Sequence, residues 1–370
     1  MTFFQFTLKN LFRRRVRTLL TIMGIGLGIG AVVALLGLAW GLQSSWQEGL
    51  KARKTDLVIR RAGGGLVAQP FDLAAAESVR QAPGIAGFGG VLAEVTSVET
   101  VPLMVISGRE WGTYLWETMS LVSGRLPKGG DEKAVVLGTI AAEMLQKKVG
   151  DTITLEVEEF PVVGIVDGKA VVENGTVIVS LEVLQNLMQK EGKVNFVNIR
   201  VTPEAGDLPA LAAKLNTGLP GLKVEIAEDV FAKNDAMRGL EAMNWGTSAV
   251  AIIVGVFGVM NTMFMSVFER NRELAILMAL GWKRKRILRM IIAESVTLCA
   301  VAGVIGVVSG IVILKTITSF PWMRGRLDPY IGWDLCALAM LLAMFVGLVS
   351  GLYPALRCTK INPSLAIRGG

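Results

Sequence analysis

The chain has 370 residues, 52% of them hydrophobic, and its mean hydropathy of +0.52 is too high for an ordinary soluble domain. It contains no histidine, so Ser-His-Asp catalysis is excluded and the commonest metal ligand is missing. The formal net charge is +7, but the basic residues gather in short segments beside apolar runs, while the long middle segment is acidic. This distribution is typical of the cytoplasmic loops of a membrane protein and argues against nucleic acid as a partner.

The first residues, 1–18, carry apolar side chains at helical spacing, with Lys9 and several arginines between them. The pattern predicts a helix that lies in the cytoplasmic interface of the membrane. The alternative is that these residues are only the beginning of the first membrane-spanning helix.

Four stretches are long enough to cross a bilayer, since about 20 mostly apolar residues suffice for a spanning helix. They are residues 19–42, 245–268, 291–314 and 335–356. The first stretch exceeds the roughly 7–15 residues of a signal-peptide core, so we expect a retained anchor.

The charges that flank these stretches predict their orientation. Basic clusters lie at Arg13–Arg17, in the loop 269–290 and in the tail 357–370. Because basic loops stay on the cytoplasmic side, we expect both termini in the cytoplasm, in a multi-pass protein of the cell (inner) membrane. Residues 43–244 and the short loop 315–334 would then lie outside the cytoplasm.

Residues 43–244, called the large domain below, mix strand and helix patterns, which predicts an α+β fold. Expected strands are Leu57–Arg60, Leu103–Ser107, Ala134–Leu137, Thr152–Val157, Pro161–Val166, Thr176–Val179, Phe196–Val201 and Lys223–Ile226. Expected helices are Asp72–Gln81, Thr139–Lys147, Leu181–Lys190 and Asp207–Asn216. The predicted fold class is thus a membrane protein with four transmembrane helices and a large α+β extracytoplasmic domain between spans 1 and 2.

Two features of the large domain concern its internal organisation. Residues 126–194 are expected to form a lobe inserted into a first lobe made of 56–125 and 195–228. Gln43–Lys54 and Asp229–Asn244 contain no proline and are rich in helix formers, so we expect them to extend spans 1 and 2 as helical stalks.

Polar and small residues within the spans mark candidate contacts between helices. Asn261 and Glu294 are intramembrane polar residues, and such residues are commonly functional. We expect Glu294 to pair with Arg270 or Arg289, or else to reach water at the membrane surface. Glycine pairs four residues apart allow close helix approach, and they occur at Gly24/Gly28, Gly26/Gly30, Gly306/Gly310 and Gly347/Gly351.

The loop 269–290 is the most informative segment. Leu274, Ile276, Leu277 and Leu280 give a short helix an apolar face, and Gly281 is expected to end it with a positive φ. Such a helix can lie on lipid or insert into a groove of a partner protein, and both possibilities stay open from the pattern alone.

No constellation of catalytic or metal-ligating residues is evident, and the glycine-rich phosphate loop of ATPases is absent from the sequence. We therefore expect a chain without its own catalytic centre, metal or cofactor.

Three membrane-proximal motifs resemble the MacB/FtsX-type permeases of ABC transporters, a group that includes the lipoprotein-releasing permeases. The first is an opening from Asn10 to Ile25. The second is an E-R-x-R-E pattern in the loop, and the third is a closing segment with Pro354, Arg357 and Pro363. The loop residues that the resemblance assigns to ATPase coupling are Glu269, Arg270, Arg272, Glu273, Leu274, Ile276, Leu277, Gly281, Trp282, Lys283 and Arg284. Residues 269–290 are called the coupling segment below.

The resemblance implies that two copies pair, either as a homodimer or with a paralogous permease, above two separate ATPase subunits that bind the ATP. Movement would pass through the spans to the large domain, without a substrate path across the bilayer. The client would be a peptide, antibiotic, lipid or lipoprotein, with a periplasmic adaptor as a further partner.

Three alternatives stay open. The large domain could activate a cell-wall hydrolase, as in other members of the family, or the chain could be a receptor or scaffold without energy coupling. Lys283–Arg286 could bind membrane lipid headgroups and not a protein.

Overall fold

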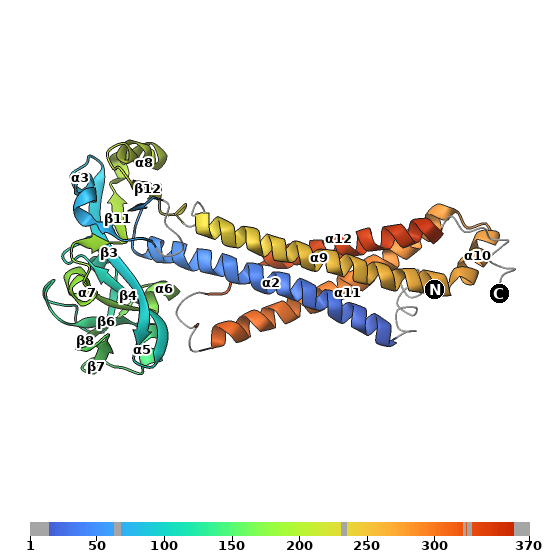
Figure 1. The fold of residues 1–370 in the computed structure, drawn as a ribbon, viewed down its shortest axis with the longest axis horizontal. Coiled ribbons are helices and arrows are strands. Elements are labelled where there is room, and N and C mark those ends of the chain that lie inside the picture. The colour runs from blue at the N-terminus through green and yellow to red at the C-terminus, as the bar shows by residue number, and fades with distance from the viewer. Residues whose placement is uncertain (1–14, 63–67, 231–234, 321–322, 324–327, 359–370) are drawn as a thin grey trace. The chain divides into compact units, whose positions relative to one another are not determined.

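The computed structural model describes residues 15–62, 68–230, 235–320, 323 and 328–358 (Figure 1). Most of the expected interfacial helix 1–18, and Pro363 with the rest of the tail beyond residue 358, lie outside these ranges. The chain divides into two compact units, which are described separately. One contains residues 1–38, 242–316 and 330–370, and the other contains 39–241 and 317–329.

Four long helices in the described residues meet the length and hydropathy required of membrane spans, and each contains one of the four predicted stretches. They are α2 (Arg15–Ala52), α9 (Asp235–Glu269), α11 (Arg284–Ser319) and α12 (Trp333–Cys358). A shorter helix, α10 (Asn271–Ala279), lies between α9 and α11 in sequence. The helix α2 continues without a break through residues 43–52, and α9 includes residues 235–244.

Glycines allow close approach between α2 and α11, as two of the predicted pairs suggested. A Cβ atom built on Gly306 would lie 2.8 Å from the Gly26 carbonyl oxygen, and one on Gly310 would lie 2.8 Å from that of Gly30. Gly347 and Gly351 bring α12 against α11 in the same way. The pair Gly24/Gly28 was predicted wrongly for contacts within this chain. A Cβ on Gly24 would meet no described atom within 4 Å, and one on Gly28 would meet the Ala251 carbonyl oxygen only at 4.0 Å.

These contacts predict that Gly310→Ala destabilises the helical unit by about 1–3 kcal/mol, the usual cost of overpacking. The added methyl group would lie 2.7 Å from Val33 Cβ, and backbone on the other helix leaves it no room. Gly24→Ala is the matched control, because it adds the same group on a spanning helix where the described atoms leave space. Thermal unfolding in detergent micelles should show a lower midpoint for the first variant alone. Equal midpoints would contradict the packing.

The large domain is built on one mixed sheet, in which the described strands run in the order β12-β1-β11-β3-β4-β9-β6-β8-β5, with β7 paired to β8. The strands are β1 (Leu57–Arg61), β3 (Ile85–Val98), β4 (Val101–Arg109), β5 (Ser120–Gly124), β6 (Val135–Gly138), β7 (Thr152–Leu155), β8 (Glu158–Asp167), β9 (Thr176–Ser180), β11 (Phe196–Val201) and β12 (Leu222–Ile226). A separate two-residue ladder joins β2 (Phe71–Asp72) to β10 (Lys193–Val194).

All eight predicted strands are present within a few residues, and so are the four predicted helices. The helices are η2 (Leu73–Ala76) followed by α3 (Glu77–Arg80), then α5 (Thr139–Leu145), α7 (Leu181–Leu187) and α8 (Leu208–Asn216). Buried residues of these helices join residues of most strands in one hydrophobic core. A further 3-10 turn, η3, covers Pro203–Ala205.

The long strand β3 was not predicted, because its glycines resemble turn residues. They serve close packing instead. A Cβ on Gly87 would lie 2.6 Å from the Tyr114 ring, and one on Gly89 would lie 2.7 Å from Leu115. Both partners belong to the short helix α4 (Tyr114–Glu117), which packs on this strand. The edge strand β5 and the short helix α6 (Val171–Asn174) were also missed.

The sheet crosses the boundary that was expected between two lobes. Strands β6 to β9 come from residues 126–194, and β9 joins β4 of the other group in a parallel pair from Val105/Thr176 to Arg109/Ser180. One exception is β5, which precedes residue 126 in sequence but pairs with β8. The two groups of strands therefore share one continuous sheet.

Candidate functional site

The coupling segment folds as the short helix α10 and a tight turn that leads into α11. Leu274 and Ala275 anchor α10, with exposed fractions of 2% and 0%, while Ile276 and Leu280 are 43% and 74% exposed. The helix therefore has an outward apolar edge as well as a buried one. The other outward residues are Glu269, Arg272, Glu273, Lys283 and Arg284, while Leu277 and Trp282 are half-buried.

Gly281 ends α10 with φ +92°, as the sequence predicted. Its N–H donates to the Met278 carbonyl oxygen, and the N–H of Trp282 donates to that of Leu277, both at 3.1 Å. This pair of bonds is the Schellman motif, which requires a left-handed residue at the position that Gly281 occupies. The Arg286 guanidinium then lies 4.3 Å from the centre of the Trp282 ring, a cation–π contact that holds the turn against the start of α11.

Glu294, in the second half of the third turn of α11, ties this segment to the spans. One guanidinium nitrogen of Arg270 donates to both carboxylate oxygens, at 3.1 and 3.2 Å. The side chains of Arg270 and Glu294 are only 17% and 10% exposed, so the pair is largely shielded from water. Of the two predicted partners for Glu294, Arg270 is the one that it contacts. Arg270 also lies 3.7 Å from Glu273.

The other predicted residues are less closely connected. Asn261 is exposed on α9 and makes no hydrogen bond to the described residues, so its expected contact with another helix is not made within this chain. Pro354 is buried within α12, and Arg357 is exposed in its last turn.

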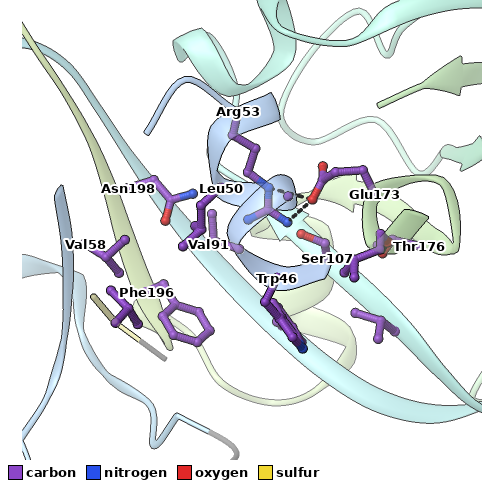
Figure 2. A pocket seen from close by; sticks show the side chains of 15 residues that line it. Trp46, Leu50, Arg53, Val58, Val91, Ser107, Glu173, Thr176, Phe196 and Asn198 are labelled. Atoms are coloured by element: carbon purple, nitrogen blue, oxygen red, sulfur yellow. Dashed lines mark hydrogen bonds and ion pairs between the residues drawn. The ribbon is translucent and has the colours of Figure 1, made fainter. Parts of the chain in front are cut away.

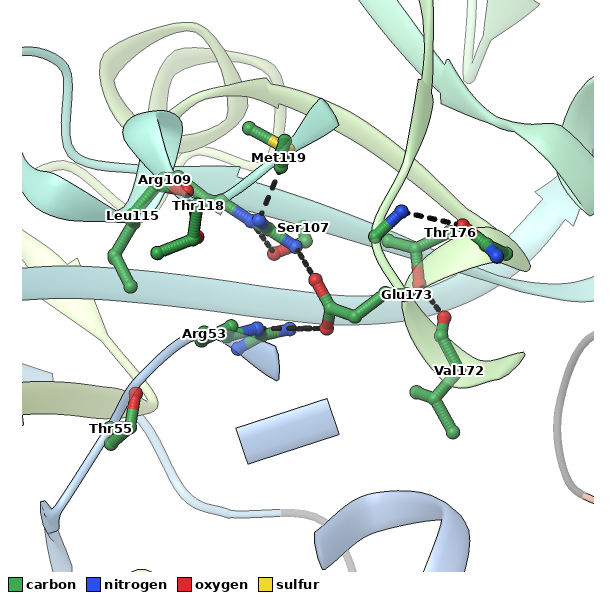
Figure 3. Close-up of polar contacts among 12 residues, drawn as sticks. Arg53, Thr55, Ser107, Arg109, Leu115, Thr118, Met119, Val172, Glu173 and Thr176 are labelled. Carbon is green, nitrogen blue, oxygen red and sulfur yellow. Dashed lines mark hydrogen bonds and ion pairs between the residues drawn. The ribbon is translucent and has the colours of Figure 1, made fainter. Parts of the chain in front are cut away.

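A second cluster, which the sequence did not reveal, lies where α2 meets the sheet of the large domain (Figure 3). The Glu173 carboxylate on α6 accepts hydrogen bonds from Arg53, just after α2, at 2.8 Å and from Arg109, at the end of β4, at 2.5 Å. Arg53, Arg109 and Glu173 are called the buried triad below, because their side chains are 12%, 0% and 2% exposed. No short motif could have indicated it, since its members are more than fifty residues apart in sequence.

Opposing effects set the pKa of Glu173. Burial alone would raise it, but the positive charges of Arg109 and Arg53, together with their hydrogen bonds, lower it to about 2. Burial lowers the pKa of Arg109, yet a guanidinium starts so high that it stays charged at neutral pH. The triad thus holds one negative charge between two positive ones inside the domain.

The depressed pKa predicts acid sensitivity of the large domain. Because Glu173 binds its proton more weakly in the folded state, its contribution is complete above about pH 5 and is lost as the pH falls towards 2. A shift from 4.5 to about 2 corresponds to about 3 kcal/mol at most. The urea midpoint should fall between pH 7 and pH 3 by more in the wild type than in Glu173→Gln. Identical pH profiles would contradict a buried, ionised Glu173.

A cavity of about 30 Å³ lies beside the triad, between the end of α2 and the sheet (Figure 2). Trp46 and Leu50 of α2 face Val58, Val91 and Phe196 of the strands across it. Asn198, also on its wall, is 1% exposed, and neither of its amide atoms has a hydrogen-bond partner among the described residues. The volume suits water and not a client molecule, since one water needs about 10–15 Å³ on this measure.

Comparison with family models decides the classification. Residues 18–217, more than half of the chain, match the model of the MacB-like periplasmic core domain, and residues 245–363 match that of the FtsX-like permease C-terminal region. The chain belongs to the MacB/FtsX-type ABC transporter permease family. It is therefore a multi-pass permease of the membrane, with the fold class that the sequence predicted.

Individual relatives cover the chain almost completely. An ABC transporter permease of Methanocaldococcus jannaschii is 28% identical over 98% of this chain and 97% of its own length. The permease YknZ of Bacillus subtilis is 23% identical, with 98% and 97% covered. A relative named macrolide export ATP-binding/permease protein MacB, from Chlorobium luteolum, is 24% identical over 99% of this chain, which spans only 60% of that relative.

Solved structures of two relatives resemble parts of the chain more remotely. The periplasmic region of MacB from Actinobacillus actinomycetemcomitans has a TM-score of 0.39 at 14% identity, covering 48% of this chain and 92% of that one. The extracellular domain of YknZ has a TM-score of 0.36 at 14% identity, covering 46% and 98%.

Proposed function

We propose that this permease takes energy from a separate ABC ATPase and passes it as movement to its large domain, which exports or extracts a client outside the cytoplasm. The client class is a peptide, antibiotic, lipid or lipoprotein. The chain acts without catalysis of its own, and ATP binds to the partner. It works as a pair of permeases, with a periplasmic adaptor as a further partner.

The observation that carries this proposal is the continuity of α2. It is a single helix of 38 residues, from Arg15 to Ala52, which is about 57 Å at 1.5 Å per residue. Arg53, the next residue, is bound to Glu173 and through it to Arg109 on the sheet. A displacement of the helix along its axis would therefore reach the sheet through strong, buried contacts and not through a loose loop.

The coupling segment is the proposed docking site for the ATPase. Its exposed apolar residues Ile276 and Leu280 stand beside exposed charged ones, a combination suited to a groove in a partner protein. The bond from Arg270 to Glu294 links this docking helix to α11. A push on α10 would thus be felt by a spanning helix.

Orientation follows from the same segment. Lys283, Arg284, Lys285 and Arg286 are all exposed at the start of α11. Such a basic cluster beside a span favours the cytoplasmic side, which places both termini there and the large domain outside.

Export is favoured over the alternatives by the relatives. The relative from Chlorobium luteolum is named for macrolide export and for ATP binding on one chain, of which this chain spans the remaining 60%. A separate ATPase is therefore proposed here. No observation specifically favours activation of a hydrolase or a receptor role.

Co-purification tests the partnership. The tagged permease, extracted from its native membrane in mild detergent, should bring down an ATPase subunit with measurable ATP hydrolysis. A variant with Ile276→Ser and Leu280→Ser should retain much less of it, while Leu121→Ser, on the exposed edge strand β5, should retain all. An eluate without any ATPase would reject the permease mechanism and leave the receptor or scaffold role.

A further inference from the structure

A cavity of about 330 Å³ opens where α9 and α12 end and α10 begins. All of its walls belong to the helical unit. The residues that line it are Phe264, Val267, Phe268, Asn271, Pro354, Arg357 and Cys358. Its volume lies at the lower end of the range of about 300–1,000 Å³ that is usual for small-molecule sites.

The walls of this cavity are mostly apolar and aromatic. The Phe264 ring stacks near that of Phe268 at 6.2 Å and meets the Tyr353 ring edge-on at 5.3 Å. Phe268 and Tyr353 remain 58% and 54% exposed, on helices that span the membrane. Apolar groups outside the cavity would therefore continue into lipid and not into water.

Two polar side chains on the same wall lack partners. Arg357 is exposed and forms no ion pair with any residue that the structure describes. Asn271 Oδ1 is buried and accepts no hydrogen bond from the described part of the chain. The neighbouring charges of Arg270 and Glu294 already neutralise each other, so Arg357 leaves a net positive charge at the cavity.

From this arrangement we propose that the cavity binds the headgroup of an acidic phospholipid. The phosphate would take hydrogen bonds from the Arg357 guanidinium, and a headgroup hydroxyl would donate to Asn271 Oδ1. The acyl chains would leave the cavity along Phe268 and Tyr353 into the bilayer. The volume fits a headgroup and its glycerol, with the chains outside.

The position of the cavity supports a lipid as its occupant. It lies at the ends of two spanning helices, where phospholipid headgroups are found, and arginines at this level commonly extend towards phosphate. The bound lipid would join α9 to α12 at the point where α10 starts. The inference depends on the membrane-spanning character of the helices and not on any ATPase, so its failure would leave the proposed function intact.

Native mass spectrometry of the full-length permease in detergent micelles tests the proposal. The protein is titrated with phosphatidylglycerol, with phosphatidylcholine and with inorganic phosphate alone. The expected result is one phosphatidylglycerol adduct that is at least about tenfold more abundant than the phosphatidylcholine adduct. Millimolar inorganic phosphate should not displace it, because phosphate lacks the acyl chains.

Arg357→Gln should abolish the preference for phosphatidylglycerol, and Asn271→Ala should weaken it. Lys285→Gln is the control, since it removes an equally exposed positive charge that does not line the cavity. Thermal midpoints verify that the variants are folded. Equal binding of the two lipids, an unchanged preference in Arg357→Gln, or displacement by phosphate would each overturn the proposal.

Discussion

Replacing Glu173 by glutamine should lower the free energy of unfolding of the large domain by about 3–5 kcal/mol, the usual cost of breaking a buried ion pair. Arg109, with no exposed side-chain surface, would lose its carboxylate partner, and Arg53 would lose the same contact. The remaining positive charges would lie close together without a counter-ion. Urea titration of the full-length permease in micelles, followed by protease resistance of the large domain, measures the change.

Two comparisons make this prediction specific. Glu158→Gln removes a carboxylate that pairs with Lys133, but these side chains are 44% and 67% exposed, so the expected cost is below about 1 kcal/mol. Converting all three members of the buried triad to apolar residues of similar size should restore most of the lost stability, because no unpaired charge remains. A Glu173→Gln variant as stable as the wild type would show that the triad contributes nothing to the attachment of α2.

Replacing Gly281 by valine should reduce the co-purified ATPase by about tenfold or more while the permease still folds and inserts. The residue has φ +92°, a conformation that costs a β-branched residue roughly 1–3 kcal/mol. The strain would be relieved by opening the end of α10, which displaces Ile276 and Leu280. A Cβ at Gly281 meets no described atom within 4 Å, so steric overlap would not confuse the result.

Gly112→Val is the matched control for this variant. Gly112 also has a positive φ, +74°, and open space around its Cβ position among the described residues, but it lies in the large domain. It should bind the ATPase normally. Charge reversal at the exposed Glu273 should weaken binding as Gly281→Val does. Normal ATPase recovery with both coupling-segment variants would reject this segment as the docking site.

The sequence was most informative where a feature depends on neighbours along the chain. The spans follow from runs of apolar residues, and the turn at Gly281 follows from glycine at the end of an amphipathic helix. The contact between α2 and α11 could be anticipated from Gly26/Gly30 and Gly306/Gly310 because small residues at that spacing permit close approach.

Features that depend on distant residues could not be predicted in this way. The buried triad brings together residues 53, 109 and 173, and nothing near Arg109 in sequence shows that it lies inside the domain. Strand β3 was hidden for a related reason. Gly87 and Gly89 look like turn residues until Tyr114 and Leu115 are seen to occupy the space that side chains would fill.

The central claim is that movement caused by the ATPase reaches the large domain, and spin-label distances test it most directly. Val157, 91% exposed in the turn between β7 and β8, is replaced by cysteine after Cys299, Cys336 and Cys358 have been replaced by alanine. The distance between labels in the paired permeases is measured with and without trapped ATP in the reconstituted complex. The account predicts a change in distance that is lost in Gly281→Val, whereas a distance that ATP leaves unaltered in the intact complex would contradict it.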